Sequence, residues 1–302
     1  MRVAVSGASG LIGTELTQVL KREGHDVLRL VRARPPGRGA AYWDPATGEI
    51  DREALAGCDA VVNLAARNIG AGRWTEATKR ELLASRTAGT GLIARTLADL
   101  DDGPRVLVSM SGVHLYGDRG DELLTEASSP GQGFMAEMVA AWEAAADPAR
   151  AAGVRVVHPR GGQVITPEGG TLQRLLPLFR LGLGGRFGDG RQWWSWISLD
   201  DMVGVIVHAL TRPDVAGPLN TCAPGLVTNG DFTHILAEVL GRPAVIPIPR
   251  FGPRLLVGDL ADALIYSSVR AVPERVLASG YEFRYPDLEG GLRAMLHRPK
   301  AA

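Results

Sequence analysis

The chain has 302 residues, 45% of them apolar and 22% charged, with a formal net charge of zero and a pI of about 7.0. These values are typical of a globular protein with one large α/β domain, or a large and a small one. Zero net charge gives no long-range attraction to nucleic acid or to an anionic membrane. Cys58 and Cys222 lie far apart and in no metal-ligand spacing, and no apolar run is long enough to cross a bilayer. With a strand starting at residue 2, we expect no signal peptide and a cytoplasmic protein without a metal site.

Short apolar strands alternate with amphipathic helices along the first two thirds of the chain. Strands are predicted at 2–6, 26–31, 59–66, 105–110, 154–160 and 217–221. Helices are predicted from the first glycines to Gly24, near 51–56, at about 74–100, at about 134–152 with a break or kink at Pro148, and at about 200–211. This alternation predicts the α/β fold class, with a Rossmann-type doubly wound parallel sheet.

The regular alternation of strands and helices ends past residue 165, where prolines and short helices indicate a smaller C-terminal α+β lobe. We assign residues 1–165 plus about 199–222 to a nucleotide-binding domain. Residues of about 166–198 plus 223–302 then form the substrate lobe.

A glycine-rich turn, G-x-x-G-x-x-G at Gly7, Gly10 and Gly13, links the first strand to the first helix. The first glycine permits a tight turn, the second lets backbone approach a pyrophosphate, and the third lets the helix pack close to the sheet. The start of the helix offers free N–H groups and a positive dipole to the phosphates. In this strand–turn–helix context the motif favours dinucleotide binding over a purely structural turn.

The segment after the second strand favours NADP(H) over NAD(H). No acidic residue lies between Asp26 and Asp44 to bind the ribose 2′-hydroxyl, whereas Arg32 follows the strand directly. An arginine there suits a 2′-phosphate, which it binds through paired N–H donors. The alternative is a solvated basic loop.

Several longer boxes carry a family resemblance. "GASGLIG", "NLAA" (63–66), "SMSGVHLYGDRGDELLTE", "WE" (142–143) and "GGRFGDGRQWWSWISLDD" together resemble the extended short-chain dehydrogenase/reductase superfamily. The chain is most similar to its atypical, NAD(P)-dependent epimerase-like branch, whose members carry the label nucleoside-diphosphate-sugar epimerase. The resemblance runs from Met1 to "YPDLEGGLRAML" (285–296) and implies a dinucleotide-binding lobe with a C-terminal lobe closing over a substrate.

The resemblance also implies cofactor-binding positions, of which Arg32 matches the 2′-phosphate contact and Leu64 and Ala65 match a strand end beside the adenosine. The positions of the phosphate loop are Gly7, Ser9, Gly10, Leu11, Ile12 and Gly13. Glu81 and Arg86 match polar positions beside the cofactor, although two charges on a solvated helix face explain them as well.

The usual acid/base pair of this superfamily is missing. Its working members use a Tyr with a Lys four residues later. In the corresponding stretch of this chain, 116–143, the residues at that spacing are Phe134 with Met138, or Met135 with Val139. No lysine lies between Lys79 and Lys300, and no tyrosine between Tyr116 and Tyr266. The standard tyrosine–lysine mechanism is therefore excluded.

Several residues are candidates for the remaining catalytic roles. Ser111 matches the serine that orients the reacting oxygen, with Ser109 as second choice, and Tyr116 and His114 follow on the next loop. A Tyr with a pKa near ~10 is a weak base but can serve as an acid, and a His serves either way; the alternative for Tyr116 is ring packing. A buried Glu126 or Glu143 could act as an acid, although Glu143 is expected to cap or pair within its helix beside Trp142.

The substrate side is expected in "GRQWWSWISLDD". At strand spacing Trp194 and Trp196 share one face and Trp193 lies on the other. Aromatic faces suit sugar or other rings, but at least one of these three tryptophans should belong to the core. Arg191 and Gln192 could meet a phosphate or carboxylate of the substrate.

Two functions remain open. The first is an NADP(H)-dependent oxidoreductase or epimerase acting on a small polar, sugar-like or cyclic metabolite. The second is a non-catalytic NADP(H)-binding sensor or regulatory protein, which the loss of Tyr and Lys motivates. By analogy with extended relatives, a homodimer would form through the helices at about 74–100 and 134–152.

Overall fold

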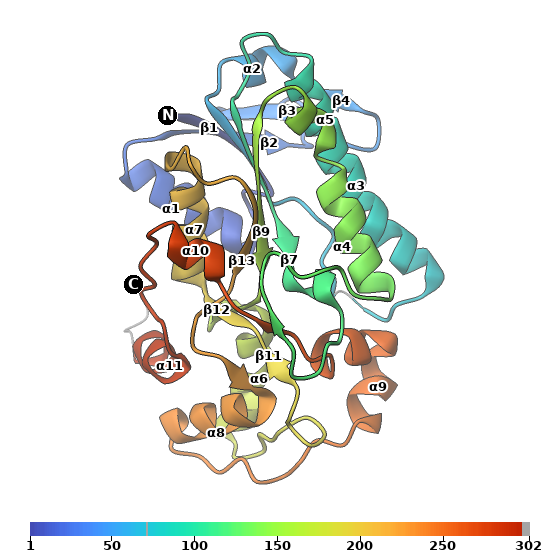
Figure 1. Ribbon diagram of the computed structural model, residues 1–302, viewed down its shortest axis with the longest axis vertical. Helices are drawn as coiled ribbons and strands as arrows, with labels where there is room; N and C mark the ends of the chain where they lie inside the picture. Colours follow the sequence, from blue (N-terminus) through green and yellow to red (C-terminus); the bar gives the residue numbers. More distant parts are fainter. Residues whose placement is uncertain (71, 298–302) are drawn as a thin grey trace.

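The computed structural model describes residues 1–70 and 72–297, and a nine-stranded sheet forms its centre (Figure 1). The strands are β1 Arg2–Ser6, β2 Asp26–Val31, β3 Ala40–Asp44, β4 Glu49–Ile50, β5 Ala60–Asn63, β6 Val106–Ser109, β7 Ser111–Gly112, β9 Arg155–Gly161 and β13 Gly217–Thr221. Their order is β13-β9-β6-β5-β1-β2-β3-β4, with β7 paired to β9. All neighbours are parallel except the β3–β4 hairpin. The predicted Rossmann-type α/β fold class is confirmed.

Helices cover both faces of the sheet, which explains why its central strands are apolar throughout. On one face α1 (Leu11–Arg22) and α7 (Leu199–Thr211) pack together, and Leu16 and Met202 join the same core as Val3 of β1. On the other face lie α3 (Glu76–Ala98), α4 (Phe134–Ala144) and α5 (Asp147–Ala151), as Figure 1 shows.

The long predicted helices are present with small differences at their ends. The helix predicted at about 74–100 is α3, which begins after the N-cap Thr75, whose hydroxyl accepts from the N–H of Thr78. The helix predicted at about 134–152 is divided into α4 and α5, and Pro148 occupies the first turn of α5, where a missing N–H costs nothing.

The β3–β4 hairpin was not predicted from the sequence, which we interpreted there as a loop followed by a helix. Tyr42 and Trp43 do alternate between partly exposed and buried, as a strand requires. The strand is only five residues long and follows an Arg/Pro/Gly loop, so that its signal is weak. The short helix α2 (Arg52–Ala56) was predicted.

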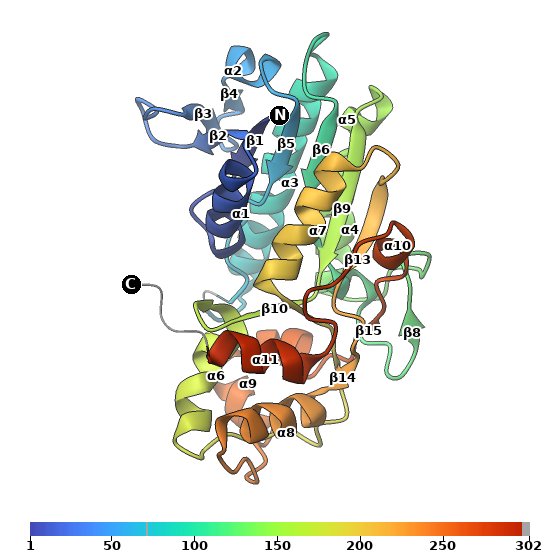
Figure 2. The ribbon, with the colours of Figure 1, turned by 90° about the vertical axis from the view of Figure 1, so that its left-hand side faces the viewer.

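A second group of helices lies below the sheet (Figure 2) and encloses a separate hydrophobic core. Helices α6 (Gly170–Arg180), α8 (Asn229–Leu240) and α11 (Leu288–Leu296) surround buried Phe179, Trp196 and Phe232. The small strands of this region are β10 Gln163–Thr166, β11 Trp193–Trp194, β12 Trp196–Ser198 and β14 Val227–Thr228. The boundaries proposed for the two lobes stay a prediction.

The C-terminal segment also reaches back to the sheet domain. Helix α9 (Phe251–Val257) and the short π-helix η2 (Ala261–Ile265) flank Leu260, which packs with Trp74, Leu115 and Met135. The remaining elements are η1 Val113–Tyr116, β8 Leu123–Leu124, β15 Arg270–Ala271 and α10 Glu274–Ala278. Within the described residues no helix combines the length and apolar character needed to cross a membrane.

Candidate active site

The glycine turn forms a tight cradle between β1 and α1. Gly7 has a φ of +67°, and a Cβ at Gly13 would lie 2.2 Å from the carbonyl oxygen of Gly7. Helix α1 has Gly10 at its N-cap, with no side chain capping it and no acidic residue in its first turn. The first N–H groups of α1 are therefore available to an anion, and only glycine fits where the helix meets the turn.

The ends of β1, β5 and β6 are joined by buried side-chain hydrogen bonds. Ser6 Oγ donates to Asn63 Oδ1 at 2.6 Å, and the Asn63 amide donates to Thr90 Oγ1 and Ser109 Oγ at 2.8 and 3.3 Å. The N–H groups of Leu64 and Ala65 donate to Ser6 Oγ at 3.1 and 3.2 Å. These bonds hold Leu64 and Ala65 rigidly beside the glycine cradle, where both remain partly exposed.

The arginines after β2 differ in their contacts. Arg34 pairs with Glu49 and lies over the ring of Tyr42, 3.7 Å from its centroid. Arg32 is exposed and makes no hydrogen bond or ion pair within the described part of the chain. Arg32 is thus the arginine of this pair with a free guanidinium.

Of the two charged residues expected on α3, only one is buried. Glu81 is exposed and pairs with Arg67. Arg86 is buried, donates to the carbonyl of Leu82 at 3.1 Å and lies over the ring of Trp142, 5.1 Å from its centroid. Its Nε has no partner in the described residues, and burial lowers its pKa to about 10.

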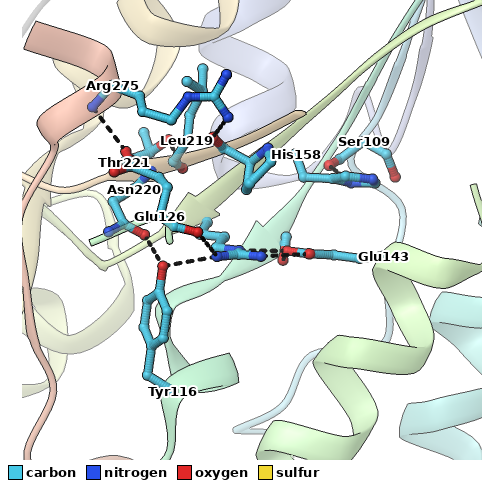
Figure 3. Close-up of polar contacts among 12 residues, drawn as sticks. Ser109, Tyr116, Glu126, Glu143, His158, Leu219, Asn220, Thr221 and Arg275 are labelled. Carbon is cyan, nitrogen blue, oxygen red and sulfur yellow. Dashed lines mark hydrogen bonds and ion pairs between the residues drawn. The ribbon is translucent and has the colours of Figure 1, made fainter. Parts of the chain in front are cut away.

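A largely buried ion pair lies at the carboxyl end of the sheet, and Figure 3 shows its carboxylate, Glu143. Arg160, at the end of β9, donates to both carboxylate oxygens of Glu143 on α4, at 2.8 and 2.9 Å. Ser111 Oγ donates to Glu143 Oε1 at 2.5 Å. Burial alone would raise the pKa of Glu143, but the hydrogen bonds and charge of Arg160 outweigh it and hold this pKa below its ordinary value. Glu143 thus pairs between elements, and our expectation of a contact within its own helix was wrong.

Tyr116 is fully buried and belongs to the same network. Its hydroxyl donates to Asn220 Oδ1 at 2.7 Å and accepts from Arg160 at 2.9 Å (Figure 3). Glu126 Oε1 accepts from the N–H groups of Asn220 and Arg275, at 2.9 and 3.2 Å. Because the Tyr116 hydroxyl is enclosed by these partners, its position favours the packing alternative over direct proton donation to a substrate.

His114 lies on the same 3₁₀ turn as Tyr116, and burial lowers its pKa to about 4. The imidazole is therefore neutral at physiological pH and can accept or donate a hydrogen bond, without contributing a charge.

Apolar side chains occupy the part of α4 where the Tyr–Lys pair was sought. Met135, Met138 and Val139 are buried in one cluster, and Phe134 meets Trp74 edge to face with centroids 5.3 Å apart. Within the described residues, no group of three His, Cys, Asp or Glu side chains could hold a metal ion.

The tryptophan box mainly builds the core of the second lobe. Trp194 and Trp196 are 4% and 1% exposed, so neither presents the ring face that we expected to stack on a substrate. The Gln192 amide donates to the carbonyls of Phe187 and Ile265 at 3.2 and 3.1 Å. Arg191 is exposed, and the partly exposed Trp193 lies 4.3 Å under the guanidinium of Arg270.

Comparison with known proteins agrees with this geometry. Residues 3–221 match the model of the NAD dependent epimerase/dehydratase family. The chain belongs to this family. Residues 248–295 also match a domain of unknown function, DUF1731.

Relatives within the family align over nearly the whole chain. Epimerase family protein Mb2239 of Mycobacterium bovis is 39% identical, over 98% of both chains. The crystal structure of human epimerase family protein SDR39U1 with NADPH has a TM-score of 0.87 at 35% identity and covers 98% of this chain and 99% of its own. A nucleoside-diphosphate sugar epimerase of Corynebacterium glutamicum has a TM-score of 0.81 at 34% identity, covering 98% of this chain and 58% of that one.

Sequence reasoning missed Arg160 and Asn220, which connect the candidate residues. Each is a polar residue at the carboxyl end of a buried strand, in "VRVVHPRG" and "GPLNT". A polar side chain at that end of a parallel strand is the signal that could have found them, because ligands bind there in open α/β sheets.

Proposed function

We propose that this protein is an NADP(H)-dependent oxidoreductase or epimerase that acts on a small polar, sugar-like or cyclic metabolite. The observation that carries the proposal is the Ser111 hydroxyl, which is held at 2.5 Å by Glu143 at the carboxyl end of the same sheet whose first turn is the glycine cradle. A serine in this position orients the oxygen of a reacting alcohol or carbonyl.

The cofactor assignment rests on the cradle and on Arg32. The uncapped start of α1 would hold the pyrophosphate, Arg32 would bind the 2′-phosphate, and Leu64 and Ala65 would border the adenosine half. NADPH in the human relative at 35% identity supports this assignment. When bound, the nicotinamide supplies hydride chemistry, and the protein supplies binding, orientation and proton handling.

The other predicted residues would border the cofactor, position the ion pair or contact the substrate. Arg86, a buried cation with an unpartnered Nε, would border the cofactor from α3, and Glu81 would hold Arg67 at its edge. Tyr116 would position Arg160 and thereby Glu143, and His114 would act as a neutral hydrogen-bonding group. Arg191 would meet the substrate, whereas Gln192, Trp194 and Trp196 would shape the lobe that holds it.

The name of the relative from C. glutamicum supports a sugar-like substrate. Two free, buried cysteines suit a reducing compartment and support a cytoplasmic location. A homodimer through α3 and α4 remains a prediction from analogy.

The apolar filling around Met135 and Met138 favours the second candidate, a non-catalytic NADP(H)-binding sensor, because it leaves no conventional proton donor on α4. The two functions share the cofactor site and differ in turnover.

The test has two stages. Nicotinamide fluorescence would follow titration with NADPH and NADH, and displacement of bound NADPH would report NADP+, first on the wild-type protein and then on Arg32→Asp. Carbonyl compounds would then be offered to the NADPH-loaded protein and nucleotide sugars to the NADP+-loaded protein, in each case with Ser111→Ala for comparison. Turnover that Ser111→Ala abolishes supports the enzyme. Tight NADPH binding without turnover favours the sensor, and failure to bind any dinucleotide contradicts both.

A further inference from the structure

The direction of the hydrogen bond between Ser111 and Glu143 follows from the charge on the carboxylate. With both oxygens of Glu143 held by Arg160, the ionised carboxylate accepts hydrogen bonds and has none to donate. The single hydroxyl proton of Ser111 therefore points at Glu143, across 2.5 Å. Ser111 itself is 5% exposed, and while its proton points at Glu143 that proton is not available to a second acceptor.

This direction determines which ligand atom Ser111 can meet. With its proton directed to Glu143, Ser111 Oγ presents only lone pairs and suits a ligand hydroxyl, which donates. A ligand carbonyl has no proton to donate and would face lone pairs. If Glu143 takes up a proton, the carboxylic acid donates to Ser111, whose own proton then turns toward the ligand.

We propose that the charge state of Glu143 selects between the alcohol and the carbonyl forms of the substrate. The alcohol binds while Glu143 is ionised, and the carbonyl binds only after Glu143 has taken up one proton. The inference rests on the proposed function in one respect, namely that Ser111 meets the reacting oxygen.

The ionised and protonated forms of Glu143 also account for the protons of an oxidation step. The substrate hydroxyl passes its proton to Ser111 Oγ, and Ser111 passes its own proton to Glu143. The hydrogen on the substrate carbon leaves with its electron pair for the oxidised dinucleotide. The products are a carbonyl bound to a donating Ser111, a protonated Glu143 and the reduced dinucleotide, and reduction is the reverse. Ser111 and Glu143 together would thus replace the missing tyrosine and lysine.

The surroundings of Glu143 favour its ionised state. Arg160 and His158 face it from β9, and Arg86 of α3 lies over the neighbouring Trp142. From η1, Tyr116 contacts Arg160, and His114 is neutral. Because the pKa of Glu143 lies below its ordinary value, carbonyl binding at neutral pH requires uptake of a proton against this field.

The test uses complexes that cannot react. A cyclic alcohol such as myo-inositol is titrated into NADPH-loaded protein, and its matched 2-ketone into NADP+-loaded protein, with cyclohexanol and cyclohexanone as a second pair. Calorimetry in two buffers of different ionisation enthalpy counts the protons taken up. We expect ketone affinity to fall about tenfold per pH unit across neutral pH with uptake of one proton, and alcohol affinity to stay constant with none.

Variants on one helix sharpen this test. Glu143→Gln carries an amide that neither gains nor loses a proton near neutral pH, so the ketone should bind without proton uptake and without pH dependence. Glu137→Gln changes an exposed carboxylate on the same helix and should behave as wild type. If Glu143→Gln does not fold, Ser111→Ala keeps the Glu143–Arg160 pair and should also remove the pH dependence of ketone binding.

Three outcomes would overturn the inference. The first is wild-type ketone affinity that does not change with pH, and the second is a pH dependence that survives in both Glu143→Gln and Ser111→Ala. The third is a dinucleotide-loaded protein that binds neither member of either pair. Absence of dinucleotide binding, measured beforehand, is a separate result that refutes the proposed function itself.

Discussion

The hydroxyl of Tyr116 donates to the side-chain oxygen of Asn220 at 2.7 Å, joining residues that are 104 positions apart in the chain. The same hydroxyl accepts from Arg160 at 2.9 Å, so that the tyrosine connects β13 to the ion pair behind Ser111. A residue that sequence reasoning places near the substrate thus forms part of the buried support of the site.

Tyr116→Phe should separate support from proton donation. The substitution leaves a buried Arg160 N–H and the Asn220 oxygen without their partner, which should cost about 1–3 kcal/mol of unfolding free energy. Urea denaturation would measure this loss, and NADPH affinity should not change. If the wild-type protein turns over a substrate, the kcat of Tyr116→Phe should be only modestly lower. A loss of several orders of magnitude, with the fold intact by circular dichroism, would instead show that Tyr116 donates the proton.

Removing Arg160 should expose the cost of a buried, unpaired carboxylate. Arg160→Met leaves Glu143 without its counter-ion and should destabilise the protein by about 3–5 kcal/mol. The double variant Arg160→Met/Glu143→Leu removes both charges and should recover much of the loss. Equal stabilities of the two variants would mean that Glu143 tolerates burial without a partner.

The pH dependence of that loss has a definite sign. In the wild type the pKa of Glu143 is lowered by Arg160, so the stability from this pair is fully present above the unfolded pKa of about 4.3 and is lost as pH falls through the folded value. In Arg160→Met, burial is unopposed and should raise the pKa of Glu143 above its unfolded value. The stability difference between the two proteins should therefore narrow on acidification, as measured by urea denaturation over a pH series.

Arg32 and Arg34 form a matched pair for testing the cofactor. Arg32→Gln should weaken NADPH binding by about 10- to 150-fold, the equivalent of about 1.5–3 kcal/mol for charge-assisted hydrogen bonds, and leave NADH binding unchanged. Arg34→Gln should change NADPH binding little, because its guanidinium is engaged by Glu49 and Tyr42. Fluorescence titration with NADPH and NADH measures the affinities of both variants. Equal losses for NADPH and NADH in Arg32→Gln would contradict recognition of the 2′-phosphate.

Gly13→Ala should disrupt the cradle itself. The added methyl group would lie 2.2 Å from the Gly7 carbonyl oxygen, so α1 must move away from the turn, and dinucleotide binding and stability should both fall. Gly37→Ala is the control, since a Cβ there meets nothing within 4 Å. Thermal denaturation and NADPH titration of both variants measure the effect. Wild-type affinity in Gly13→Ala would show that the glycine cradle does not bind the cofactor.

The sequence by itself determined the features that depend on neighbouring residues. The strand–turn–helix around Gly7, Gly10 and Gly13 and the apolar strands of a doubly wound sheet are local patterns, and each appears where it was predicted. Arg32 follows its strand directly and is exposed, and its role at the 2′-phosphate stays a prediction. The loss of the Tyr–Lys pair is likewise evident from the positions of tyrosine and lysine in the sequence.

Only the tertiary structure decided which polar groups meet. Ser111 and Glu143 are 32 positions apart, and their contact depends on how β7, α4 and β9 pack, for which no local pattern codes. The spacing of Trp194 and Trp196 predicted one shared strand face, but the two residues lie in β11 and β12, strands of two different sheets, and both are buried in the same core. Local sequence sets the period of an element, whereas the burial of its faces depends on elements that join it from distant parts of the chain.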